Sequence, residues 1–273
     1  MNKRKDTHKK PPGGKKKQEV VGLEYTIIGG RQPVLEALRG TQILLQKVYV
    51  QESAHGRVIE EIKQAASERN VPLKHVSRDE LDQKAEEQIH QGVVALTRPY
   101  RYLKIEELLE LAHRSGLPGS HPFLLILDHL QDPHNFGSLL RSASCFGVGG
   151  VIIPSDRACG VTPAVFKASA GALAHVPVAR AVNLHREVER LKKEGYWIMG
   201  AEMGENTPYD QVDFALPLAL VLGSEGQGLS RLLREKCDVL LHIPMLGPLL
   251  SLNVSVAGGI LMSQVFKQRS KQS

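Results

Sequence analysis

Short apolar runs alternate with amphipathic segments along the second half of the chain. Phe123–Leu127 is a continuous apolar run, which is typical of a strand buried on both faces of a sheet. Similar patterns predict further strands at 150–154, 197–199, 218–222 and 239–243, and helices at 136–146, 184–193, 230–236 and 254–268. Strands that alternate with helices predict a largely parallel sheet covered on both faces, so the expected fold class is α/β.

A second, smaller α/β unit precedes this one. Apolar residues recur at helical spacing within 57–69, and Leu45–Val50 alternates like a strand. Helices at 31–38 and 78–85 and strands at 71–76 and 92–96 complete the unit. We therefore divide the chain into a basic tail (1–20), a first domain (21–98), a linker (99–122) and a second domain (123–273). The linker joins a helical run at 105–112 to a loop rich in Gly, Pro and Ser.

Positive charge is concentrated in residues 1–20. They carry eight Lys or Arg and two acidic residues, so the tail accounts for the whole formal net charge of +6. Such a segment cannot bury enough apolar surface to order itself, and we expect it to be disordered. It suits a tether for a polyanion such as RNA; a solubilising tail without a partner is the alternative.

Composition narrows the class of protein further. No stretch of eighteen apolar residues occurs and no apolar run follows the basic N-terminus, which argues against a membrane span and a secretory signal. Cys145, Cys159 and Cys237 form no CxxC pair, so we expect reduced thiols in a cytoplasmic protein. The 11 histidines are scattered without the spacing of metal ligands, and we expect no metal.

Three segments rich in Gly, Asn or Ser each follow a predicted strand, at 128–141, 222–229 and 243–257. Ligands of a parallel α/β sheet collect beyond the carboxyl ends of its strands, so these segments predict one shared site. The glycine-rich segment is neither a GxGxxG fingerprint nor a phosphate-binding P-loop. Its spacing therefore counts against a dinucleotide-dependent oxidoreductase.

Each segment also has a plainer structural interpretation. Ser251 and Asn253 suit the cap of a helix. Arg141 interrupts an apolar helix, where it is either ion-paired or directed at an anion. Asn135 lies six residues earlier and can edge the same pocket as Arg141 if the helix begins near it. The glycines of 222–229 suit a flexible turn as well as a ligand-binding one.

In this order and at these distances, the segments resemble the three motifs of the TrmH/SpoU family of RNA 2′-O-ribose methyltransferases, in the SPOUT superfamily. The matching residues are Asn135, Gly137 and Arg141, then Gly223–Gly226, then Ser251–Ser255, with Lys167–Ala172 as a further similar stretch. The N-terminal unit, from residues 28–31 to residues 90–93, is similar to the family's substrate-binding domain. The resemblance covers about residues 24–268 and is strongest to the RlmB-like branch, which modifies a guanosine of 23S ribosomal RNA. Pro248–Leu250 departs from the family pattern by being more apolar.

This resemblance implies features that the hydrophobic pattern does not show. The second domain would be a SPOUT-type α/β domain with a parallel sheet and a deep trefoil knot. The first would be a small L30e-like α/β substrate-binding domain. S-adenosylmethionine would be the cofactor, RNA the partner, and a homodimer would pack through the knotted region. The apolar closing helix at 254–268 is compatible with such an interface and equally with a monomer core.

The resemblance also implies roles for individual residues. Arg141 would stabilise the developing 2′-alkoxide or the flanking phosphate; its pKa is too high for a base, so the RNA itself or a water would take the proton. Asn135 would orient the ribose or Arg141, and Glu225 would position its motif or an incoming donor group. Ser251 and Asn253 would shape the pocket and contact the substrate, so these residues and Arg141 are the catalytic candidates. The cofactor-binding candidates are Leu222, Gly223, Ile243, Met245, Gly247, Leu252 and Ala257, and the RNA-binding candidates are Arg31, Lys167 and Arg141.

Other residues are interpreted as ordinary structure. We expect His129 and His134 to face solvent and Trp197 to lie in the core. With 5% aromatic residues, the chain suits RNA recognition by shape and backbone contacts better than by base stacking. Two alternatives stay open: a methyltransferase of the same family acting on transfer RNA or in antibiotic resistance, and a non-catalytic RNA-binding protein of ribosome assembly.

Overall fold

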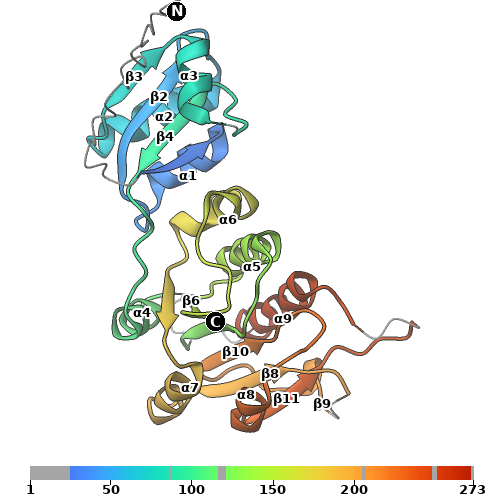
Figure 1. Ribbon diagram of the computed structural model, residues 1–273. Helices are drawn as coiled ribbons and strands as arrows, with labels where there is room; N and C mark the ends of the chain where they lie inside the picture. Colours follow the sequence, from blue (N-terminus) through green and yellow to red (C-terminus); the bar gives the residue numbers. More distant parts are fainter. Residues whose placement is uncertain (1–24, 87, 116–120, 205–206, 248–250, 272–273) are drawn as a thin grey trace, which may run out of the picture.

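A computed structural model describes residues 25–271, except 87, 116–120, 205–206 and 248–250. Two α/β units follow one another along the chain, the first at the top of Figure 1 and the second below it. The predicted basic tail lies outside the described residues, and so does the apolar Pro248–Leu250 segment.

The N-terminal unit is a four-stranded mixed sheet in the order β1-β4-β2-β3. Its elements are β1 (Thr26–Gly29), α1 (Arg31–Arg39), β2 (Leu45–Gln51), α2 (Arg57–Glu68), β3 (Leu73–Val76), α3 (Arg78–Ala85) and β4 (Val93–Thr97). β4 runs antiparallel to both β1 and β2, whereas β2 and β3 are parallel. Leu35 of α1 and Ile59 of α2 join the core on one face of the sheet, and Leu81 of α3 packs with Tyr49 and Val94 on the other.

The C-terminal unit is a seven-stranded sheet in the order β7-β6-β5-β10-β8-β11-β9, and all its paired strands are parallel. The strands are β5 (Phe123–Leu127), β6 (Gly150–Pro154), β7 (Val178–Ala181), β8 (Trp197–Ala201), β9 (Thr207–Pro208), β10 (Leu218–Leu222) and β11 (Val239–His242). The helices are α4 (Ile105–Ala112), α5 (Pro133–Cys145), α6 (Pro163–Ala168), α7 (Leu184–Lys193), α8 (Arg231–Lys236) and α9 (Val254–Arg269), with short 3-10 turns η1 (Ala172–Ala174) and η2 (Tyr209–Gln211).

Burial of β5 on both faces confirms the interpretation of its apolar run. Phe123, Leu125 and Leu127 pack into the core that contains α5 and α9, whereas Leu124 and Ile126 pack into the core that contains α4, α7 and α8. This division follows from the alternation of side chains along a strand. The sheet is therefore sandwiched between two helical layers, as the alternating pattern predicts.

The prediction for Trp197 is wrong. Its side chain is 44% exposed, although the next two residues, Ile198 and Met199, are buried. Trp197 is the first residue of β8, where its N–H donates to Pro217 O at 2.8 Å. A residue at the end of a strand lies at the rim of the sheet, so its size and apolar character do not ensure burial.

The segment interpreted as a linker is attached to the C-terminal unit. Helix α4 belongs to the core on one face of the seven-stranded sheet, and Leu103 forms a parallel bridge with Ala179 of β7. The hydroxyl of Tyr100 accepts a hydrogen bond from Val178 N at 3.0 Å, and that of Tyr102 accepts one from Val161 N at 2.6 Å. These contacts hold the connection between the units at the edge of the larger sheet.

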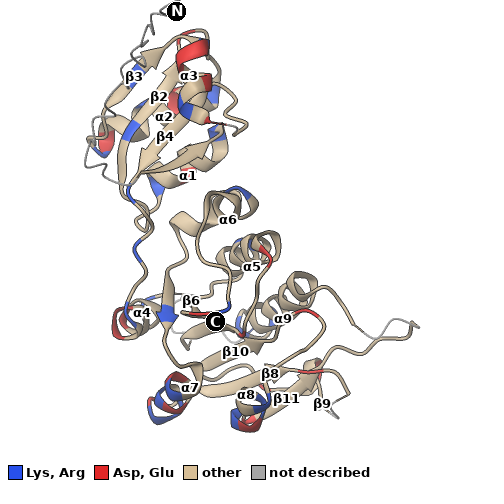
Figure 2. Ribbon diagram, in the orientation of Figure 1, with Lys and Arg blue, Asp and Glu red and all other residues tan. Residues whose placement is uncertain are grey.

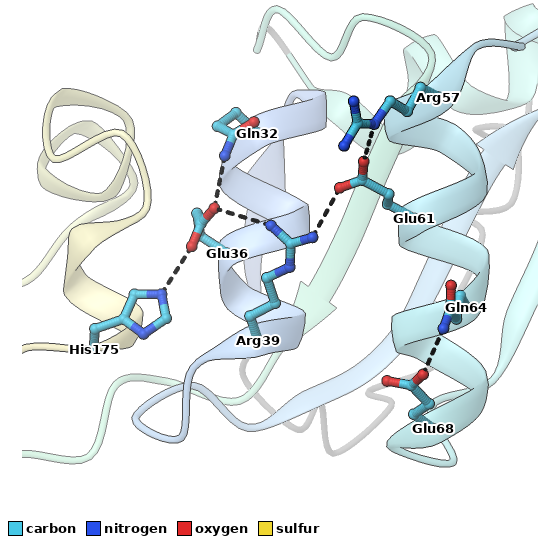
Figure 3. A network of polar contacts seen from close by, with 8 residues as sticks. All are labelled: Gln32, Glu36, Arg39, Arg57, Glu61, Gln64, Glu68 and His175. Carbon is cyan, nitrogen blue, oxygen red and sulfur yellow. Dashed lines mark hydrogen bonds and ion pairs between the residues drawn. The ribbon is translucent and has the colours of Figure 1, made fainter.

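The two units touch through α1 and the segment around η1. The Gln42 N–H donates to Ala174 O at 3.2 Å. Figure 3 shows the second contact, in which His175 Nε2 lies 2.9 Å from Glu36 Oε2. Glu36 is also 3.9 Å from Arg39, which reaches Glu61 of α2 at 2.8 Å. A Cβ on Gly40 would lie 2.1 Å from Ala174 O, so the two backbones are in direct contact at that point.

Replacing Gly40 with alanine should separate the two units. Gly40 has φ −80 and ψ 167, which alanine adopts freely, so the added methyl acts only through its clash with the Ala174 carbonyl. We expect a larger radius of gyration by small-angle X-ray scattering and faster proteolysis near residues 98–103. Thr41→Ala, an exposed neighbour, is the matched control. An unchanged scattering profile for Gly40→Ala would contradict the close docking.

Arg269 anchors the end of α9 to the loops that precede β5 and β10. Its guanidinium donates to three backbone carbonyls, Phe214 O at 3.0 Å, His121 O at 2.6 Å and Leu216 O at 2.7 Å. Burial lowers the pKa of Arg269 to about 10, so the side chain still carries its charge at neutral pH.

Replacing Arg269 with methionine should therefore lower the free energy of unfolding by about 3 kcal/mol, because three backbone carbonyls would lose a charged donor. Urea denaturation followed by circular dichroism measures the change. Lys267→Met, on the exposed side of the same turn, is the control and should leave the transition nearly unchanged. Equal midpoints for the two variants would show that Arg269 does not anchor the helix.

Candidate functional site

The first motif is positioned by the cap of α5. The Asp132 carboxylate accepts hydrogen bonds from His134 N at 3.2 Å and Asn135 N at 3.1 Å, and Pro133 opens the helix. Both features are favourable helix starts, since a carboxylate satisfies free N–H groups and proline needs none. They hold Asn135 in the first turn, where its side chain is buried.

The third motif caps α9, as the plainer interpretation of Asn253 predicts. Its Oδ1 accepts from Ser255 N at 2.9 Å and from the Ser255 hydroxyl at 2.6 Å. The other end of the same amide faces the first motif, because Nδ2 donates to Asn135 Oδ1 at 3.0 Å. Asn253 thus starts the helix and joins the site at the same time.

Glu225 connects the second motif to the other two. Its Oε1 accepts hydrogen bonds from Asn135 Nδ2 and, at 3.3 Å, from Asn253 Nδ2. One side chain from each of the three segments therefore meets in a single hydrogen-bonded group, which we call the amide–carboxylate cluster. Each amide in this cluster has a fixed orientation, since one end accepts and the other donates.

The glycine-rich segment forms a closed turn after β10. Ser224 and Gly228 exchange backbone hydrogen bonds of 3.1 Å in both directions. Gly226 and Gly228 have φ of +81 and +66, a left-handed backbone that favours glycine. A Cβ on Gly223 would lie 2.1 Å from the Gly228 carbonyl carbon, so the start and end of the turn are in contact.

A cavity of about 610 Å³ lies beyond the carboxyl ends of β8, β10 and β11, within the usual size range of small-molecule sites. Nine of the predicted site residues line it: Leu222, Gly223, Glu225, Ile243, Met245, Ser251, Leu252, Asn253 and Ala257. Asn135 does not line the cavity but bonds to two residues that do. Gly247 is not part of the lining.

One wall of the cavity was missing from the sequence prediction. Ala201, Glu202 and Met203 belong to the lining, as do His242 and several residues of the glycine turn. The rule that ligands lie beyond the ends of parallel strands applies to β8 as much as to its neighbours. The stretch that follows the predicted strand 197–199 is polar and resembles no family motif. Only the rule about strand ends could therefore have identified this wall from the sequence.

Arg141 stands apart from the cluster in this chain. It is exposed on α5, six residues beyond Asn135, which places the two side chains roughly 120° apart around the helix axis. It does not line the cavity and forms no ion pair with another described residue. Arg141 is therefore available to an anion that approaches the outer side of α5.

The two other RNA-binding candidates lie away from the cavity. Lys167 is exposed on α6. Arg31 borders a smaller hollow of about 500 Å³ in the N-terminal unit, where its guanidinium donates to Gln91 O at 3.0 Å and to His55 O at 3.2 Å. Carbonyls position this guanidinium but do not neutralise its charge.

The charged surface of α7 and α8 has a different character. Figure 2 shows basic and acidic residues side by side on these helices, and several are paired, such as Lys192 with Asp238 at 2.7 Å. Lys236 similarly pairs with Glu189. Since each sign is largely offset by the other, this surface offers a phosphate chain little net attraction.

The described residues contain no group of three or more His, Cys, Asp or Glu that could hold a metal ion, and no helix among them has the length and apolar character to cross a membrane. His129 pairs with the buried Asp128. Burial raises the pKa of the Cys237 thiol to about 12, which keeps it protonated and unreactive at neutral pH.

The chain belongs to the SpoU rRNA Methylase family, whose model matches residues 122–263. A second model, RNA 2′-O ribose methyltransferase substrate binding, matches residues 27–103. A Bacillus subtilis (strain 168) protein, YacO, named within the TrmH family of tRNA/rRNA methyltransferases, is 40% identical over 247 residues, which are 90% of this chain and 97% of the relative. A Staphylococcus haemolyticus relative with a TrmH-family name is 42% identical over 248 residues, which are 90% of this chain and 97% of that one. The predicted family and its N-terminal substrate-binding domain are thus confirmed.

Solved structures show the same fold at lower identity. The SpoU methyltransferase AviRb from Streptomyces viridochromogenes, in complex with AdoMet, superposes with a TM-score of 0.72 at 20% identity over 90% of this chain and 91% of that chain. An AdoMet-bound rRNA methyltransferase from Sinorhizobium meliloti gives 0.72 at 21% identity over 89% and 87%. Both structures share the arrangement of the two units. This likeness supports the fold and does not identify the substrate.

Proposed function

We propose that this protein is an S-adenosylmethionine-dependent methyltransferase that modifies the 2′-oxygen of a ribose in RNA. The amide–carboxylate cluster of Asn135, Glu225 and Asn253, beside a cavity that is lined in part by the glycine turn, carries the proposal. We favour a guanosine of 23S ribosomal RNA as the target, because the motifs resemble the RlmB-like branch most. Transfer RNA is the alternative within the same chemistry, since the names of the relatives cover both substrates.

The cavity suits an adenosyl group. Its lining combines apolar side chains, such as Leu222, Ile243 and Leu252, with the backbone of the glycine turn. The close contact of Gly223 with Gly228 leaves no room for a side chain there, so a ligand meets backbone N–H and carbonyl groups. This mixture of apolar walls and few polar groups is typical of small-molecule sites.

The bound cofactor would supply an electrophilic methyl group on a sulfonium. The cluster then orients what attacks it. Asn135 and Asn253 are already locked by their bonds to each other and to Glu225, so a donor such as the second Nδ2 hydrogen of Asn135 needs no reorganisation to hold a ribose oxygen. Ser251, exposed beside the cavity, offers a hydroxyl to the same oxygen.

Arg141 would stabilise negative charge on the attacking oxygen or on the neighbouring phosphate. Its planar guanidinium presents several donors to such an anion. Because Arg141 is exposed on the outer side of α5, it would act on an RNA that lies across this helix, either on a single protomer or within a dimer. The proton of the 2′-hydroxyl would pass to the RNA or to water, since an arginine is not a base at neutral pH.

A homodimer would pack through α9 and its neighbour α5. Val256 and Phe266 of α9 are 50% and 40% exposed, and Phe266 lies 6.1 Å from the ring of Phe146 at the end of α5. These apolar side chains would be buried by a second copy. The trefoil knot that the resemblance implies stays a prediction.

Basic residues of both units would add affinity for the RNA backbone. Arg31 has no acidic neighbour among the described residues that line its hollow, and Lys167 of the C-terminal unit is exposed on α6. Both would contact phosphates, which give affinity without reading the base.

Transfer of labelled methyl from S-adenosylmethionine to unmodified ribosomal RNA, with transfer RNA in parallel, tests the proposal. A single 2′-O-methylated guanosine in 23S RNA supports it in full, and label in transfer RNA changes the substrate but keeps the chemistry. Cofactor binding without transfer to either RNA would favour the non-catalytic alternative, an RNA-binding protein of ribosome assembly. Label on a base in place of a ribose would overturn the 2′-O assignment.

A further inference from the structure

Glu202 is an acidic residue of the cavity lining, in addition to Glu225. It lies outside the three family motifs, on the wall that follows β8. It directly follows β8, and its N–H donates to Leu241 O of β11 at 3.0 Å, which fixes its backbone at the sheet edge. Its Oε2 accepts from Leu229 N at 3.3 Å. A Cβ on Gly228 would lie 3.0 Å from Oε1, so the carboxylate rests against the end of the glycine turn.

Most of the hydrogen-bonding capacity of this carboxylate is unused by the described residues. Glu202 forms no ion pair with another described residue, and its Oε1 has no hydrogen-bond partner among them. Glu225, the other acid among the described lining residues, differs because it accepts from two side-chain amides of the cluster, whereas Glu202 accepts from one backbone N–H. A partly buried carboxylate oxygen next to a ligand-sized cavity is suited to accept hydrogen bonds from that ligand.

His242 stands beside Glu202 on the neighbouring strand. Leu241 is in register with Ala201, so His242 and Glu202 occupy equivalent positions at the ends of β11 and β8. Both residues line the cavity. The Nδ1 of His242 is shielded from water, so it does not face the open cavity, and it has no partner among the described residues. Buried polar atoms are usually paired, and a rotation of the ring toward the cavity would pair this nitrogen with a ligand.

We propose that Glu202 determines recognition of the cofactor by accepting hydrogen bonds from the ribose hydroxyls of its adenosyl group, with His242 as the second polar group at that end. This inference rests on the proposed function, in which the cavity holds S-adenosylmethionine. Two neighbouring hydroxyls present two donors, which match a carboxylate oxygen and an adjacent imidazole. The carboxylate of the methionine part is excluded from this wall because Glu202 would repel it.

The assignment also orients the cofactor. An acidic side chain beyond a parallel strand performs the same task in dinucleotide-binding folds, where it holds a ribose hydroxyl. With the ribose held near β8 and β11, the methyl-bearing end of the cofactor would face the wall formed by Glu225 and Asn253. Glu202 is thus a specificity-determining residue with no part in the chemical step.

Calorimetric titration of two ligands into the full-length protein tests this inference. The probes are S-adenosylhomocysteine and its analogue without the 2′- and 3′-hydroxyls. We expect the wild-type protein to prefer the hydroxylated ligand by about thirtyfold, the magnitude of hydrogen bonds to a charged group. Glu202→Gln should reduce the preference to about threefold while binding the dideoxy ligand nearly as well as wild type.

This experiment distinguishes a structural role of Glu202 from a role in recognising the ribose. If Glu202 only supported the glycine turn, Glu202→Gln would weaken both ligands equally and keep the preference, which would overturn the inference. A different result would overturn the assignment to the ribose: Glu202→Gln would keep its preference for the hydroxylated ligand but would no longer distinguish S-adenosylhomocysteine from an analogue without the amino group. His242→Phe should lower the same preference, and Glu235→Gln, an exposed acid paired with Arg231 on α8, should not change it.

The proposed function fails separately. A wild-type protein that binds neither S-adenosylmethionine nor S-adenosylhomocysteine would overturn that function and this inference together. A wild-type protein that binds both, with a preference untouched by Glu202→Gln and His242→Phe, would overturn the inference alone.

Discussion

Replacing Arg141 with alanine should lower methyl transfer to RNA by about 100- to 1000-fold, the usual cost of removing one donor that stabilises a developing oxyanion. The affinity for S-adenosylmethionine should stay within about twofold of wild type, because Arg141 does not line the cavity. Single-turnover transfer of labelled methyl gives the rate, and calorimetry gives the affinity. The two readouts together distinguish a role in transfer from a role in binding the cofactor.

Two further variants sharpen this expectation. Arg141→Lys keeps the charge but loses the planar fork of donors, so it should recover only part of the rate. Arg186→Ala removes an exposed arginine in the first turn of α7, whose charged surface is mixed in sign, and should leave the rate unchanged. Normal turnover in Arg141→Ala would remove this residue from the mechanism. A loss of cofactor affinity in the same variant would assign it to the pocket instead.

The hydrophobic pattern predicted which strands are buried, but it did not predict which strands lie next to each other in the sheet. The runs that became β5 and β10 are apolar throughout because each lies inside the sheet with a helical layer on both sides. Strand β7 was missed because it is short and places an exposed Arg180 in its middle. The order of strands in the sheet was beyond prediction from the pattern, since periodicity reports which face is buried and carries no information on which strand lies alongside.

The site shows the same division between chemistry and geometry. Residues at strand ends were identified because three segments rich in Asn, Ser or Gly each follow a buried strand, and the carboxyl ends of parallel strands meet at one edge of the sheet. Their partners were not, because the bond from Asn135 to Glu225 joins residues 90 positions apart. Asn253 also shows that the two interpretations of a capping residue are compatible, since its amide oxygen caps α9 while its nitrogen joins the cluster.

Replacing Gly223 with alanine should have the opposite signature to Arg141→Ala. The new Cβ would lie 2.1 Å from the carbonyl carbon of Gly228, 2.2 Å from its oxygen and 2.4 Å from Leu229 N. Backbone atoms on the far side of a closed turn cannot yield as a flexible side chain would, so the turn must open. We expect the dissociation constant for S-adenosylmethionine to rise by about a hundredfold, because the backbone groups that shape the cavity move with the turn.

Gly195→Ala separates this effect from ordinary backbone strain. Gly195 has φ +86 and no atom within 4 Å of an added Cβ, so alanine there costs about 1 kcal/mol of strain without obstructing anything. Both variants should keep the far-UV spectrum of an α/β protein, but only Gly223→Ala should lose the cofactor. If Gly223→Ala bound S-adenosylmethionine normally, the glycine turn would have no part in the cofactor site. If it lost transfer while binding normally, the turn would instead act on the RNA.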